Sequence, residues 1–152
     1  MTRIAGEVVI EAPVEEVFDL VADERNEPSY NPRIVRAEKV GDTPVGPGAR
    51  YVVEPRGAGR RGEITVETVE YDRPRRLRTV VVSSYLAVDG VLAFTPVEGG
   101  TRLGWDWDMR LVGPVRLLSP VLRLVGPRWE RRNWVGLKEH VEGRGARPGA
   151  AG

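Results

Sequence analysis

The sequence predicts an α+β fold: a curved, seven-stranded antiparallel sheet wrapped around a long C-terminal helix, with two short helices after the first strand. Two observations carry this prediction. Upstream of residue 112, several segments alternate apolar and polar residues, as strands with one buried face do. Between 115 and 142, apolar residues recur at spacings of three and four, as on one face of an amphipathic helix. This helical stripe comprises Leu118, Val121, Leu122, Val125, Trp129, Asn133, Leu137 and Val141.

Composition narrows the class of protein. For 152 residues we expect one domain over 1–142, followed by a disordered, glycine-rich tail over 143–152. A formal net charge of only +1 gives no reason to expect a nucleic-acid partner. The chain has no cysteine and a single histidine, so we predict no metal site, and we predict no cofactor.

The ends and apolar runs of the chain bear on its location. The N-terminus lacks the long apolar run of a signal peptide. No stretch reaches the roughly 20 apolar residues that a membrane span needs. We therefore expect a cytoplasmic protein.

The expected elements follow one another in a simple order. The first strand covers 4–11, a short helix continues to about residue 22, and a polar helical turn and loop extend to 32. Pro13 suits the first turn of that helix. A change of phase within the fourth strand predicts a bulge near Glu67 and Thr68. The later strands are expected at 34–40, 49–54, 63–71, 77–83, 85–96 and 101–111.

Two glycine–proline pairs shape the expected terminal helix. After Gly113 and Pro114, we expect a short helical piece that starts between 115 and 118. Gly126 and Pro127 should kink or split the helix, because proline removes a hydrogen bond and clashes with the preceding turn. The main piece is then expected from about 127 to 141.

The last hairpin has the clearest strand pattern. One face of its second strand carries Leu103, Trp105, Trp107, Met109 and Leu111 in alternation with charged residues. With a turn at 97–100, the expected cross-strand pairs are Phe94 with Leu103, Leu92 with Trp105, and Gly90 with Trp107. Gly90 then leaves room beside an indole. Each tryptophan is either core or a ligand contact, since cores and apolar pockets use the same residue types.

Five segments carry a family resemblance. They are VIEAPVEEVFDLVAD at 9–23, NP at 31–32, EYDRPRRL at 70–77, FTP and GGTRL within 94–103, and NWVGLK at 133–138. They resemble the START-like, polyketide cyclase/dehydrase-like (SRPBCC) superfamily, and most closely its bacterial cyclase-like branch. The resemblance implies a helix-grip fold with an elongated apolar cavity between the sheet and the last helix. Members hold lipids, polyketides, sterols or hormones there, and some cyclise or dehydrate a bound polyketide.

The candidate ligand-binding residues are those expected to face this cavity. They are Tyr30, Tyr85, Leu92, Phe94, Trp105, Trp107, Trp129 and Asn133. Most carboxylates are expected on outward positions, so the interior should lack an obvious acid or base. Asn133 is either a polar anchor for a ligand or a buried amide bonded to backbone. His140, near the end of the helix, is expected to be structural.

Three functional hypotheses follow, and whether the protein is an enzyme stays open. The leading hypothesis is binding or transport of one small hydrophobic molecule, such as a lipid or a polyketide. The alternative is a polyketide cyclase or dehydratase in which Tyr30, Tyr85 or Asn133 polarises a carbonyl; a strongly shifted acid or base inside the cavity would favour it. The third is an interaction domain whose interior is filled by its own tryptophans.

One segment suggests a further partner. Residues 111–129 interleave apolar side chains with Arg116, Arg123 and Arg128. Such a segment can lie transiently on a membrane surface. It can also be the start of a helix that packs on the sheet, which is the arrangement we expect here.

Overall fold

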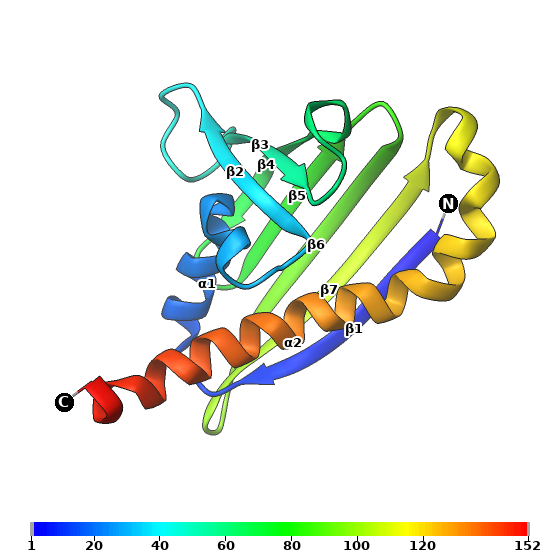
Figure 1. The fold of residues 1–152 in the computed structure, drawn as a ribbon. Helices are drawn as coiled ribbons and strands as arrows, with labels where there is room; N and C mark the ends of the chain where they lie inside the picture. The colour runs from blue at the N-terminus through cyan, green and yellow to red at the C-terminus, as the bar shows by residue number, and fades with distance from the viewer. Residues whose placement is uncertain (1, 152) are drawn as a thin grey trace.

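The computed structural model describes residues 2–151, with side chains described for 2–143. Seven antiparallel strands form one sheet in the order β1-β7-β6-β5-β4-β3-β2, and the long C-terminal helix α2 runs along β1 (Figure 1). Short 3₁₀ helices are labelled η. The elements are β1 (Thr2–Ile10), α1 (Val14–Ala22), η1 (Glu24–Ser29), β2 (Ile34–Val40), β3 (Arg50–Pro55), η2 (Arg60–Gly62), β4 (Ile64–Asp72), β5 (Arg76–Val82), β6 (Leu86–Val97), β7 (Gly100–Leu111), η3 (Gly113–Leu118) and α2 (Ser119–Ala151). The predicted fold class is confirmed.

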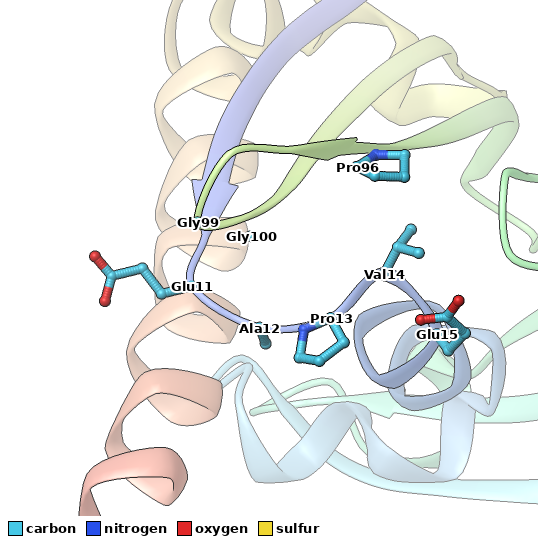
Figure 2. A pocket seen from close by; sticks show the side chains of 8 residues that line it. All are labelled: Glu11, Ala12, Pro13, Val14, Glu15, Pro96, Gly99 and Gly100. Atoms are coloured by element: carbon cyan, nitrogen blue, oxygen red, sulfur yellow. The ribbon is translucent and has the colours of Figure 1, made fainter.

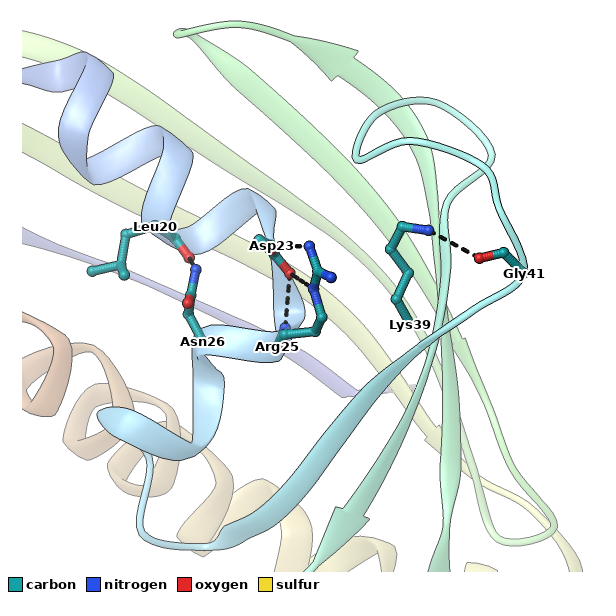
Figure 3. A network of polar contacts seen from close by, with 6 residues as sticks. All are labelled: Leu20, Asp23, Arg25, Asn26, Lys39 and Gly41. Carbon is teal, nitrogen blue, oxygen red and sulfur yellow. Dashed lines mark hydrogen bonds and ion pairs between the residues drawn. The ribbon is translucent and has the colours of Figure 1, made fainter.

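The two short helices after β1 are tied to each other and to the sheet. The buried face of α1 contains Phe18, whose ring meets those of Tyr71 and Phe94 edge-on at 5.2 and 5.0 Å. The Nδ2 group of Asn26 in η1 donates to the Leu20 carbonyl at the end of α1, at 3.1 Å (Figure 3). The Asn26 hydrogen bond holds η1, which carries Glu24 and Glu27, against the end of α1.

The register of the last hairpin confirms the cross-strand pairs that the sequence predicts. Leu92 lies opposite Trp105, and Gly90 lies opposite Trp107. A Cβ atom on Gly90 would lie only 1.5 Å from Trp107 Cε3, so the indole lies directly over the glycine. The predicted bulge is also present, because the β4–β5 register shifts between Thr68 and Glu70.

Helix α2 does not divide at Pro127. Its helical assignment is continuous through Pro127, and Figure 1 shows the axis changing direction between the yellow first turns and the orange main part. The prediction of a separate main piece from 127 is therefore wrong, while the kink predicted at Gly126 and Pro127 stays a prediction. A proline removes one hydrogen bond, which bends a helix without ending it when the neighbouring bonds persist. Gly126 lets the helix approach the sheet, since a Cβ there would lie 2.6 Å from Ile4 Cδ1.

The apolar stripe predicted along this helix is only partly buried. Asn133, Leu137 and Val141 are buried, whereas Val121 and Trp129 are exposed. A constant step of four residues drifts around a helix by about 40° per step, because a turn contains 3.6 residues. Three such steps separate Trp129 from Val141, which is enough to turn its side chain away from the sheet.

Two expectations about the chain as a whole have different outcomes. Within the described chain, no helix is long and apolar enough to cross a bilayer. The backbone of α2 continues to Ala151, but side chains from residue 144 onward lie outside the described residues. The single domain over 1–142 and the disordered tail over 143–152 therefore stay predictions.

Candidate functional site

A carboxylate from α2 lies between the helix and the sheet, held by two indoles. Trp107 Nε1–H on β7 donates to Glu130 Oε2 at 2.6 Å, and Trp134 Nε1–H donates to the same oxygen at 3.2 Å. Burial raises the pKa of Glu130 above its ordinary value, against the opposing effects of the two indole donors and of the nearby Arg33 charge. An acid with a raised pKa retains its proton to higher pH than an ordinary carboxyl group does, so Glu130 is a candidate proton donor.

Helix η1 brings two more carboxyl groups to the same interior. Burial raises the pKa of Glu24 well above its ordinary value, and the charge and hydrogen bond of Glu27 raise it further. Glu27 also raises the pKa values of Tyr30 and Glu130, though less than burial does. The Glu27 carboxylate is held by Asn31, whose Nδ2 group donates to it at 3.0 Å. The charge of Glu27 thus acts on both other acids, Glu24 on η1 and Glu130 on α2.

Three polar atoms in the interior have no hydrogen-bond partner among the described residues. They are the hydroxyl of Tyr51, the indole nitrogen of Trp105 and Oδ1 of Asn133. Each residue is more than nine-tenths buried. Burial, with the neighbouring charges of Asp23 and Glu24, raises the pKa of Tyr51 to about 12, so its hydroxyl keeps its proton. Leaving such a group unpaired costs about 1–3 kcal/mol, which a bound polar partner would recover.

Most of the predicted ligand-binding residues lie in this interior. Tyr30, Leu92, Phe94, Trp105, Trp107 and Asn133 are all buried. Trp105 stacks on Trp134 with ring centroids 6.0 Å apart. Asn133 is buried, as expected. One alternative had its side-chain amide bonded to backbone, but Asn133 Oδ1 has no hydrogen-bond partner among the described residues. A ligand-binding role for these residues stays a prediction.

Two predicted residues lie elsewhere. Tyr85 is half-buried beyond the end of β5, where its hydroxyl donates to the Gly62 carbonyl at 2.8 Å. Trp129 is 47% exposed, and its ring lies 5.5 Å from the Arg33 guanidinium. The inward position expected for Trp129 is therefore wrong, for the helical drift described above. His140 contacts Tyr30, with ring centroids 6.4 Å apart.

The sequence analysis did not identify Trp134 or the acidic residues Glu24, Glu27 and Glu130 as candidate site residues. The expectation that the interior lacks acids is wrong, because Glu130 lies there. A signal existed: Glu130 precedes Trp134 by four residues and the buried Leu137 by seven, the spacing of one helical face. No comparable signal marks Glu24 and Glu27, because η1 is a short 3₁₀ helix whose buried side depends on what packs against it.

Two surface hollows lie away from this interior. The first, of about 540 Å³, lies between the β1–α1 junction and the β6–β7 turn, and Figure 2 shows Val14 and Pro96 facing one another across it, with Glu11 turned away. The second, of about 370 Å³, lies on the convex face of the sheet among Arg78, Asp89 and other charged side chains. Neither lies between the sheet and α2, and the candidate site is defined here by its side chains.

The fold and the site together define a class of protein. A curved antiparallel sheet that closes on one long C-terminal helix, with a polar group set into an aromatic interior, is the helix-grip architecture. The chain belongs to the family described as polyketide cyclase/dehydrase and lipid transport, whose model matches residues 1–142.

Solved structures with the same fold come from several sources. A START superfamily protein from Mycobacterium smegmatis has a TM-score of 0.77 at 16% identity, over 93% of this chain and 98% of that one. A protein from Thermus thermophilus has a TM-score of 0.76 at 22% identity, with the same coverage of both chains. The di-domain ARO/CYC BexL has a TM-score of 0.71 at 25% identity, over 93% of this chain but only 47% of BexL. A comparison with curated protein sequences gives no match.

Proposed function

We propose that the protein binds one small, mostly apolar molecule that carries oxygen atoms, between the sheet and α2. The observation that carries this proposal is the pair of unpartnered polar atoms on Trp105 and Asn133, whose neighbour Trp134 stacks on Trp105. Buried polar groups nearly always have a partner, so a ligand with hydroxyl or carbonyl groups would complete them. The family description, which names polyketide and lipid chemistry, supports the same ligand class.

The binding free energy would come mainly from apolar contact. Removing apolar surface from water contributes about 25 cal/mol per Å², and the indoles of Trp105 and Trp107 offer large apolar faces. The polar atoms would then select the ligand. The indole N–H of Trp105 would donate to a ligand oxygen, and Asn133 Oδ1 would accept from a ligand hydroxyl.

Blocking the concave face of the sheet should weaken this binding. Val81 is half-buried on the concave side and packs against two groups of buried residues, one that includes Trp105 and one that includes Tyr51. Its neighbour Val80 points to the convex side, opposite Asp89. We expect Val81→Phe to weaken binding of the neutral fluorophore phenylnaphthylamine about tenfold or more, because an added ring occupies the ligand's space. Fluorescence titration of the purified protein measures the dissociation constant.

Val80→Phe is the matched control, since it makes the same change one residue away on the opposite face. It should bind the fluorophore as the unmodified protein does. Equal affinities for both variants would contradict the location of the site, and no binding to any of the proteins would contradict the proposed function.

A second function, catalysis of dehydration or cyclisation, is favoured by one observation: the buried carboxyl of Glu130, with its raised pKa. In its protonated form this group would donate to a substrate carbonyl, or to a hydroxyl that leaves as water while the proton of the neighbouring α-carbon passes to solvent water and a C=C bond forms. Tyr30 and Asn133 stay candidates for polarising the carbonyl, while Tyr85 is occupied by the Gly62 carbonyl.

Glu130→Gln separates catalysis from binding. We expect the variant to keep fluorophore affinity but to lose turnover of a β-hydroxy ketone by about 100-fold or more, the usual contribution of a positioned acid. In the unmodified protein, turnover should fall as pH rises through the raised pKa of Glu130, because the acid form is then lost. Unchanged turnover in the variant would exclude Glu130 as the acid.

A further inference from the structure

The segment that follows β7, made of η3 and the first turns of α2, exposes apolar side chains together with arginines. Its apolar side chains are not covered by the rest of the chain: Leu117 is 82% exposed, Leu124 69% and Val121 51%. The expected packing of this helix start on the sheet is therefore found near Gly126, which approaches Ile4, and not at these exposed residues. Val121 and Leu124 lie three residues apart on α2, which places them on one side of that helix, and Leu117 lies in the preceding η3. Leu118 and Trp129 add to the exposed apolar surface.

The charges on this segment are all of one sign. Between Met109 and Trp129 the sequence has four arginines and no acidic residue. Arg116 and Arg123 each directly precede one of the exposed leucines, so positive charge flanks the apolar side chains along the segment.

These arginines differ from those on the sheet. On the convex face, Arg3 pairs with Asp106 at 2.9 Å and Arg78 pairs with Asp89 at 2.7 Å. Among the side chains described for 2–143, Arg116, Arg123 and Arg128 form no ion pair. The first acidic residue after them, Glu130, is turned inward to Trp107 and Trp134. The positive charges of these three arginines are therefore not neutralised by an acidic side chain among the described residues.

We propose that η3 and the first turns of α2 bind the surface of an anionic lipid bilayer. The exposed leucines would enter the boundary between the headgroups and the acyl chains, and the neighbouring guanidinium groups would bind the lipid phosphates. A second copy of the chain fits less well, because a two-fold contact through this face would place its arginines against one another. Figure 1 shows the segment at one end of the molecule, beyond the strands, where a flat surface can reach it.

Vesicle flotation of the full chain tests the proposal. The protein should float with vesicles made of equal parts phosphatidylcholine and phosphatidylglycerol, but not with phosphatidylcholine alone. Each arginine should strengthen partitioning about fivefold, so Arg116→Glu/Arg123→Glu should weaken it by about 25-fold or more. Leu117→Asp/Leu124→Asp should weaken it by about tenfold or more, through lost apolar burial. High salt should reduce the binding of the unmodified protein.

Matched controls make the same chemical changes elsewhere. Arg60→Glu/Arg61→Glu reverses two exposed arginines in η2, and Val82→Asp adds a charge at an exposed apolar position on β5. Both should float as the unmodified protein does, and circular dichroism should show all variants folded, since every altered side chain is exposed. Absence of flotation, or equal loss in the controls, would overturn the proposal. So would a dimer in light scattering that Leu117→Asp/Leu124→Asp converts to a monomer, since that face would then be a protein interface.

Discussion

Trp134→Ala is expected to lower the free energy of unfolding by about 3–5 kcal/mol, the usual cost of removing a buried aromatic side chain. Trp134 is only 5% exposed and contacts the rings of Trp105 and Trp107. The change would also remove one of the two indole donors to Glu130 and leave that buried carboxylate less well bonded. Urea unfolding followed by far-UV circular dichroism measures the loss.

Trp129→Ala is the matched control, because it removes the same side chain from the same helix. Trp129 is largely exposed and contacts Arg33, so its removal should cost about 1 kcal/mol or less. Equal losses in the two variants would mean that α2 does not present the face described here to the sheet.

Gly90→Ala is expected to cost about 1–3 kcal/mol or more, through overpacking against an indole. A Cβ at this position would overlap Trp107 Cε3, so the indole must move. Because Trp107 also donates to Glu130, its displacement should disturb the candidate site as well as the core. Thermal or urea unfolding measures the first effect, and fluorophore titration measures the second.

Gly104→Ala provides the comparison on the adjacent strand. The nearest atom to a Cβ there is the Gly6 carbonyl oxygen at 3.8 Å, an ordinary contact. This variant should be as stable as the unmodified protein or slightly more stable, since alanine restricts the unfolded chain. A loss as large as that of Gly90→Ala would show that glycine is needed in these strands for backbone reasons and not for the indole.

Much of the fold follows from local pattern. Alternation along β7 and a short turn fix which residues of β6 lie opposite the tryptophans, so the pairing of Gly90 with Trp107 could be predicted. The bulge in β4 could be predicted from its change of phase. Such features depend on residues close in sequence or on directly paired strands, where periodicity alone is informative.

The interior acids and the exposed helix start depend on contacts between distant segments. Reading α2 in steps of four placed Trp129 inward and passed over Glu130 and Trp134, which share the buried face. The apolar stripe at 117–124 has the same spacing whether or not a sheet covers it. The position of η1 decides which of its polar groups face the interior, and that position is not encoded in a short window of sequence.

The four tryptophans allow a direct test of the central claim, that the interior between the sheet and α2 receives an apolar molecule. NMR spectra of ¹⁵N-labelled protein resolve each indole N–H signal as phenylnaphthylamine is added. The signals of Trp105, Trp107 and Trp134 should shift, while that of the exposed Trp129 should stay in place. Movement of the Trp129 signal alone, or of none of the four at saturating fluorophore, would contradict the account.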